Sequence, residues 1–103
     1  MADFMKILQQ AQEMQGRFQK AQEELAQLSV SGTAGGGMVT VEANGQGTVR
    51  SIKIDPSVVS ASDVEMLEDL VLVAVTEAQR KAAELAKEEM GRLAGGLPFK
   101  LPF

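Results

Sequence analysis

Apolar and small side chains recur at alternating steps of three and four residues along the first quarter of the chain. They fall at Phe4, Ile7, Ala11, Met14, Phe18, Ala21, Leu25 and Leu28. This is the a/d pattern of a heptad repeat, and it predicts one long helix over residues 3–28. A stripe this narrow suits contact with a second helix better than contact with a broad core. We therefore expect either the second predicted helix or another chain to cover it.

After residue 28 the pattern changes to the two-residue period of β-strands. Residues 29–31 predict a short strand, and the glycine-rich residues 32–37 predict a flexible connection. Residues 38–43 alternate and predict a second strand, with Val39 and Val41 on one face. The order of elements so far is a helix followed by the start of an antiparallel sheet.

The pair Asn44-Gly45 predicts a hairpin that leads into a third strand over residues 47–54. The apolar parity changes between Val49 and Ile52, which predicts a bulge near Arg50 and Ser51. Proline at position 56 cannot continue the ladder, so we expect the sheet to end there.

A second helical period begins after Ser62 and holds to about residue 90. Ser62 and Glu65 fit a capping box, and we expect Ser62 to open this helix. Residues 70–75 are apolar on every side, so this stretch needs burial all round. Residues 1–94 therefore form a single predicted domain, and residues 95–103, which contain two prolines, predict a flexible C-terminal tail.

The predicted fold class is α+β, with a long helix, an antiparallel three-stranded sheet built on a β-hairpin, and a second long helix. Three strands leave open edges and little area to cover two long helices. We expect a homodimer that shares a central sheet, which would remove an edge and bury the apolar stretch of the second helix. The expected dimer interface consists of Val39, Val41, Ile52, Ile54, Leu70, Val71 and Val75.

Composition removes most routes to catalysis. The 103 residues include no His, Cys, Trp or Tyr, and the net charge is −4. Without imidazole or thiol groups the usual zinc, haem and iron–sulfur ligands are missing, so we expect no metal, no cofactor and no catalytic residues. The longest apolar run has six residues, where a membrane-spanning helix needs about twenty. We expect a cytoplasmic protein that is not an enzyme and has neither a membrane partner nor a small-molecule substrate.

Three segments, in their order and spacing, resemble the YbaB/EbfC family of bacterial nucleoid-associated proteins, and the resemblance runs essentially end to end. The most specific are Gly35-Gly36-Gly37-Met38-Val39-Thr40-Val41, Asn44-Gly45-Gln46-Gly47 and Val49-Arg50-Ser51-Ile52-Lys53-Ile54-Asp55-Pro56. The resemblance implies a homodimer with a shared sheet and helical arms arranged like tweezers. It also implies binding of double-stranded DNA with little sequence preference, and a role in nucleoid organisation or gene regulation.

Carried onto this chain, the resemblance makes the basic residues of the two long helices the candidates for DNA binding. These are Lys6, Arg17, Lys20, Arg80, Lys81 and Lys87. One alternative stays open, which is a protein–protein interaction module that uses the a/d stripe of the first helix together with the apolar tail. Reversing the charge of Lys20 or Arg17 would impair DNA binding, whereas changing Phe18 or removing the tail would impair partner docking.

Overall fold

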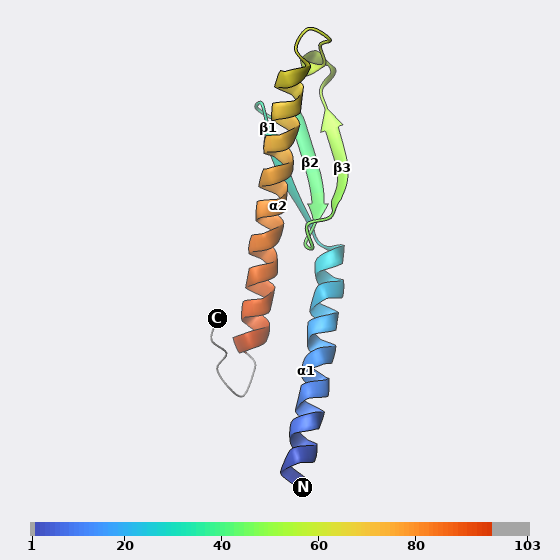
Figure 1. The fold of residues 1–103 in the computed structure, drawn as a ribbon, viewed down its shortest axis with the longest axis vertical. Coiled ribbons are helices and arrows are strands. Elements are labelled where there is room, and N and C mark those ends of the chain that lie inside the picture. The colour runs from blue at the N-terminus through green and yellow to red at the C-terminus, as the bar shows by residue number, and fades with distance from the viewer. Residues whose placement is uncertain (1, 96–103) are drawn as a thin grey trace.

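The computed structural model describes residues 2–95 of the chain (Figure 1). The elements are α1 (Ala2–Gln27), β1 (Ser29–Ala34), β2 (Val39–Asn44), β3 (Val49–Ile54), a short 3-10 helix η1 (Pro56–Val58) and α2 (Val64–Gly95). The molecule is elongated, with extents of 72 × 21 × 16 Å and a radius of gyration of 19.8 Å. A compact chain of this length has a radius of gyration of about 13 Å, so part of the chain extends away from the core.

The three strands form an antiparallel sheet in the order β1-β2-β3. Glu42 pairs with Ser51 and Ala43 pairs with Val49, which leaves Arg50 as the extra residue of a bulge. The predicted bulge is confirmed at the predicted position. Because of it, the apolar residues of β3 all lie on the same face as those of β2, although their parity along the chain changes.

Strand β1 is longer than the sequence pattern predicts. Gly32, expected in the flexible connection, is paired with Val41 inside the strand. An added Cβ at Gly32 would lie 2.5 Å from the backbone nitrogen of Ala78 and closer still to the carbonyl oxygen of Ala74. The missing side chain thus lets β1 lie directly against α2. The connection to β2 is only a tight turn, in which Gly35, Gly36 and Gly37 have positive φ angles.

The β2–β3 hairpin is confirmed, but its turn differs from the two-residue type that an Asn-Gly pair favours. The Gly47 N–H donates to the Asn44 carbonyl at 3.0 Å, and only Gly47 in this turn has a positive φ. Gly45 is required for a different reason, since its N–H donates to the Leu25 carbonyl at 2.8 Å and a Cβ would lie 2.7 Å from the same oxygen. The hairpin is therefore attached to the end of α1.

Helix α2 is capped by Asp63 rather than by the predicted Ser62. The Asp63 carboxylate accepts a hydrogen bond from the Met66 N–H at 3.1 Å, whereas the Ser62 hydroxyl is 2.8 Å from that of Ser60. A carboxylate at this position also interacts favourably with the helix dipole. The helix continues to Gly95, beyond the predicted end at about residue 90. The rest of the predicted C-terminal tail, residues 96–103, lies outside the described residues.

A second short-range cap precedes η1. Asp55 accepts a hydrogen bond from the Ser57 N–H at 2.8 Å, and this bond holds the pKa of the carboxyl below its usual value. A carboxyl group whose pKa is lower in the folded state stabilises that state when the pH is above the ordinary pKa. This stabilisation is lost as the pH falls through the lowered pKa. Because Asp55 is fully exposed, water screens this contribution to the free energy of unfolding.

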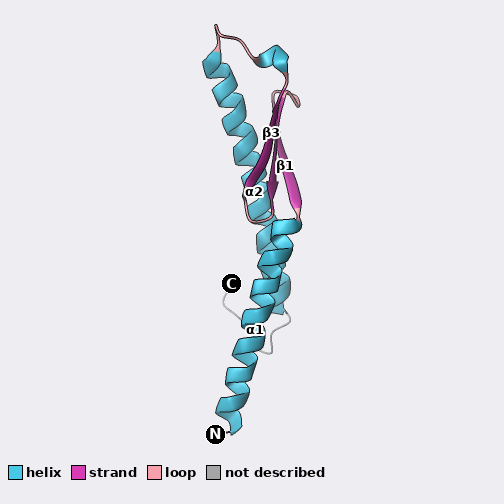
Figure 2. Ribbon diagram, turned by 90° about the vertical axis from the view of Figure 1, so that its right-hand side faces the viewer, coloured by secondary structure: helices cyan, strands magenta, loops and turns pink. Residues whose placement is uncertain are grey.

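The core lies between α2 and the sheet and consists of small side chains. Ala74, Ala78, Val39 and Val41 are completely buried, and Ala43 is nearly so. Alanine on the helix and glycine on the strand allow close packing of their backbones. Helix α2 packs mainly on β1 and β2, and Figure 2 shows it covering one side of the sheet.

An apolar surface, the β3 patch, remains where α2 leaves β3 uncovered. Ile52, Ile54 and Leu72 are 45%, 38% and 65% exposed. Beside them is a shallow depression of about 480 Å³ lined by Ile54, Leu67, Glu68, Val71, Leu72 and Val75. Contacts within residues 2–95 therefore do not supply the all-round burial expected of residues 70–75.

Candidate nucleic-acid interface

Helix α1 is anchored at its C-terminal end and projects away from the sheet over most of its length (Figures 1 and 2). Ala21 and Leu25 are buried, and the Gln46 side-chain amide donates to the Gln22 carbonyl at 2.9 Å. Toward the N-terminus, Phe4 and Ile7 are each 61% exposed. A helix of 26 residues is about 39 Å long, so roughly its first half stands clear of the core.

Three of the predicted DNA-binding residues share one side of α1. At 3.6 residues per turn, Lys6, Arg17 and Lys20 lie within an arc of about 60° around the helix axis. All three are exposed, and we call them the basic flank. Lys6 and Lys20 are about 21 Å apart along the axis. Glu13 and Glu24 lie within the same arc, so the net charge of this side of α1 is +1.

The basic residues of α2 are held differently. The Arg80 guanidinium lies 2.7 Å from the Glu84 carboxylate, and the Lys81 ammonium lies 3.3 Å from that of Glu77. Within residues 2–95, every ion pair is on α2. Exposed pairs of this kind contribute at most about 1 kcal/mol, but each carboxylate cancels the cation beside it. Arg80 and Lys81 thus present less net positive charge than the basic flank of α1.

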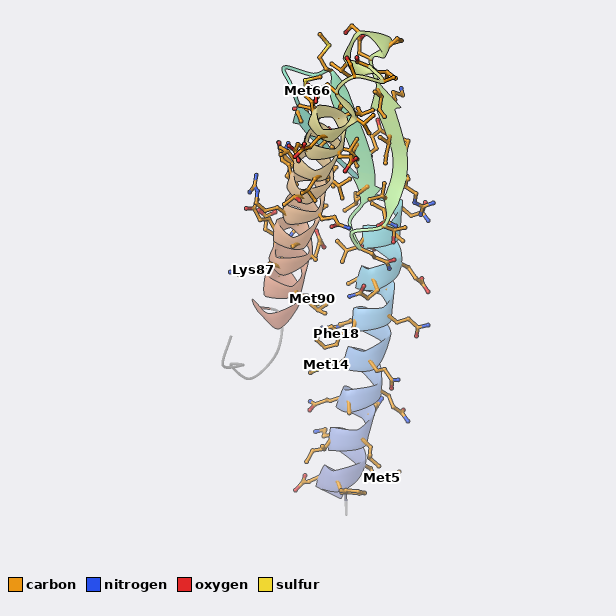
Figure 3. The ribbon with its side chains drawn as sticks, turned by 45° about the horizontal axis from the view of Figure 1, so that its top comes forward. Met5, Met14, Phe18, Met66, Lys87 and Met90 are labelled. Carbon is orange, nitrogen blue, oxygen red and sulfur yellow. The ribbon has the colours of Figure 1, made fainter. Side chains whose placement is uncertain are left out.

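The six predicted DNA-binding residues do not form one patch. Figure 3 shows Lys87 on the side of α2 that points away from α1. The structure therefore brings together only the three residues of the basic flank. Two further exposed cations, Arg50 and Lys53, lie on β3, and Lys53 is paired with Thr40 on the sheet face opposite α2.

The predicted dimer residues occupy three environments. Val39 and Val41 have no exposed surface and belong to the core of the chain itself, so they cannot contact a second chain directly. Leu70, Val71 and Val75 are half-buried, and Ile52 and Ile54 are exposed. Exposed Leu72, which the sequence pattern did not single out individually, lies beside this last group.

Other classes of site find no support in the described part of the chain. Within residues 2–95, no group of three or more acidic side chains is arranged to hold a metal ion. None of the helices in that range is both long and apolar enough to cross a membrane.

Several known proteins are similar to this chain over nearly all of its length. Residues 1–97 match the model of the YbaB/EbfC DNA-binding family. A nucleoid-associated protein of Gemmatimonas aurantiaca is 52% identical over 103 residues, covering 98% of this chain and 99% of the relative. Another, from Chloroflexus aurantiacus, is 57% identical over 91 residues, which are 88% of this chain and 91% of that protein.

The fold has a solved counterpart as well. The crystal structure of an uncharacterized protein from Helicobacter pylori superposes with a TM-score of 0.79 over 87% of this chain and 95% of that one. The sequence identity is 23%, so this likeness concerns the fold alone. The family match covers nearly the whole chain and agrees with the relatives over the same residues. The chain therefore belongs to the YbaB/EbfC DNA-binding family.

Proposed function

We propose that this protein is a nucleoid-associated protein that binds double-stranded DNA as a homodimer with little sequence preference, helping nucleoid organisation or gene regulation. The observation that carries the proposal is the basic flank, which gathers three exposed cations on a projecting helix of a chain from a DNA-binding family. Lys6, Arg17 and Lys20 would contact phosphates, which position a protein on DNA without reading its sequence. Arg80, Lys81 and Lys87 remain secondary candidates on α2.

The overall charge requires that attraction to DNA be local. A net charge of −4 per chain gives no long-range attraction to a polyanion, so contact depends on where the cations lie. A dimer would present two basic flanks, which gives six cations for phosphate contact. An α-helix is about 10–12 Å wide, and the major groove of B-DNA is about 12 Å wide, so α1 is narrow enough to approach the groove.

The β3 patch supports the homodimer. Its side chains Ile52, Ile54 and Leu72 are exposed in the chain on its own, and β3 is a strand at the edge of the sheet. Contiguous exposed apolar surface beside an open edge marks an interaction site. A second copy placed there would cover the open edge and the side of α2 next to it. The interface that we propose is therefore centred on Ile52, Ile54, Val71 and Val75. Leu70 lies close to Gly35 in the β1–β2 turn, away from this patch, and is left out of the proposed interface.

Salt dependence tests the proposed DNA binding. With four to six phosphate contacts per dimer, we expect a plot of log affinity against log salt concentration to fall with a slope between about −4 and −5. The measurement is fluorescence anisotropy of labelled duplexes of two unrelated sequences, titrated from low to physiological salt. Equal affinities for both duplexes are expected. Absence of binding at the lowest salt concentration would refute the proposal.

The mass in solution tests the homodimer. Light scattering should give twice the chain mass of 11.0 kDa, and Ile52→Lys should reduce it to that of one chain. Because Ile52 is 45% exposed, its substitution should leave each chain folded, which circular dichroism can check. Val73→Lys is the matched control, since Val73 is 54% exposed on another side of α2 and should not affect assembly. A mass of 11.0 kDa for the unmodified protein would disprove the dimer.

A further inference from the structure

A second apolar surface, the α1 groove, is separate from the β3 patch. It is a depression of about 470 Å³ lined by Ile7, Gln10, Ala11, Met14, Gln15 and Phe18. Met14 and Phe18 are half-buried, while Phe4 and Ile7 beyond them are mostly exposed. Helix α2 therefore covers only the C-terminal part of the a/d stripe of α1. The sequence alone did not show whether α2 or another chain would cover this stripe. Exposed apolar surface of this kind marks a place where something docks.

The end of α2 lies beside this groove. Ala86 and Gln22 line the same depression between the two helices, which run in opposite directions. Gly95 is nine residues after Ala86 on α2, and Glu13 is nine residues before Gln22 on α1. Because the helices are antiparallel, Gly95 lies at about the level of Glu13. Figure 3 agrees, since Met90 points toward Phe18 and Met14. The residues that follow Gly95 in the sequence therefore start next to the α1 groove.

Those following residues have an unusual alternation. Leu97, Phe99, Leu101 and Phe103 are separated by Pro98, Lys100 and Pro102. A residue before proline is held in an extended conformation, and proline has no N–H to donate to a β-ladder. In an extended segment alternate side chains point to the same side. The sequence is thus suited to pack through one apolar side rather than to join the helix or the sheet.

The length of the segment after Gly95 determines which of the two apolar surfaces, the α1 groove or the β3 patch, it can reach. Eight extended residues span at most about 26–29 Å. From the level of Glu13 to Phe4 is about 14 Å along α1, which is well within this span. Leu72 in the β3 patch lies about 35 Å back along α2 from Gly95, which is out of reach. The segment can cover the α1 groove and cannot cover the β3 patch of its own chain.

We propose that residues 97–103 dock in extended form on the α1 groove of the same chain, with Phe99 over Ala11 and Leu101 over Ile7. The segment would cover the apolar stripe on the exposed half of α1 and leave the basic flank open. Lys100, on the opposite side of the segment from its apolar residues, would stay in water and add a cation to this end of the molecule. This assignment is independent of DNA binding.

Paired cysteines test the proposal, because the chain has none of its own. Gln10 lines the groove, and Gln9 is the matched control on the side of the helix opposite the groove. In the full-length protein, Gln10→Cys combined with Leu101→Cys places both thiols on facing sides, as a disulfide requires. This pair should form an intrachain disulfide under mild oxidation at least about tenfold faster than Gln9→Cys combined with Leu101→Cys. Non-reducing gel electrophoresis under denaturing conditions separates the intrachain product from linked chains.

Two further samples make the result decisive. Adding Leu97→Ser and Phe99→Ser to the Gln10 pair should slow the reaction to the rate of the Gln9 pair, since docking depends on the apolar side chains. Mixing a Gln10→Cys chain with a separate Leu101→Cys chain should give little linked dimer. Equal rates for Gln9 and Gln10 would overturn the docking. A dominant linked dimer in the mixture would overturn the same-chain assignment and place the segment on a second copy.

Discussion

Gly32→Ala should destabilise the protein strongly, although it adds only one methyl group. The added Cβ would meet the backbone of α2 at Ala74 and Ala78 rather than a side chain that can rotate away. Overpacking of a core lowers the free energy of unfolding by about 1–3 kcal/mol. A clash with two backbone atoms, which cannot rotate away, should cost about 3 kcal/mol or more. For a chain of this size, a decrease of about 3 kcal/mol in the free energy of unfolding lowers Tm by roughly 12 °C or more.

Gly16→Ala is the control for this experiment. Nothing lies within 4 Å of a Cβ added at Gly16, and the residue is exposed in the middle of α1. Alanine there should stabilise the helix by up to about 1 kcal/mol, because glycine is the poorer helix former. Thermal unfolding at one fixed protein concentration compares both variants with the parent, since Tm of a dimer depends on concentration. If Gly32→Ala unfolded at the parent Tm, the close packing of β1 on α2 would be wrong.

Reversing two charges on the basic flank should remove most of the DNA affinity. In a dimer, Arg17→Glu combined with Lys20→Glu replaces four of six proposed phosphate contacts with repulsive carboxylates. Removing one phosphate contact reduces the steepness of the salt dependence by about 0.9, so the slope should fall to about −2 or less in magnitude. At low salt we expect the affinity to drop by about a hundredfold or more, measured by anisotropy with the same duplexes.

A charge-matched variant separates local contact from a change in total charge. Arg50→Glu combined with Lys53→Glu reverses the same two residue types on β3 and produces the same net charge. If the basic flank makes the contacts, this control should bind DNA within about threefold of the parent, since screening weakens distant charges at physiological salt. A decrease in affinity confined to the β3 variant would move the DNA interface to the sheet and contradict the assignment to α1.

Local patterns predicted most of the secondary structure. The heptad steps from Phe4 to Leu25 predicted α1 to within about a residue, because helical periodicity depends only on near neighbours. The parity change between Val49 and Ile52 located the bulge at Arg50 for a similar reason. Pairing a strand with its neighbour requires all apolar residues to lie on one face, so a shift in parity needs an extra residue.

The expectations that failed depended on contacts that residue types alone do not specify. Glycine at position 32 is typical of a loop, and only its close approach to Ala74 and Ala78 places it in β1. Ser62 and Asp63 are both good helix caps. In the folded chain the Ser62 hydroxyl is hydrogen-bonded to that of Ser60, and the Asp63 carboxylate caps the helix instead. Each outcome depends on which atoms the folded chain brings together.

Which of the predicted DNA-binding cations lie together also depended partly on the folded structure. The sequence by itself determined which cations α1 carries and, through the helical period, that Lys6, Arg17 and Lys20 share a flank. The same period places Glu84 beside Arg80 and Glu77 beside Lys81, four residues away along α2. Only the tertiary structure showed that α1 projects from the core and that Lys87 points away from α1. The period of a helix follows from local hydrogen bonding, whereas the direction in which one helix faces another follows from packing between residues far apart in the chain.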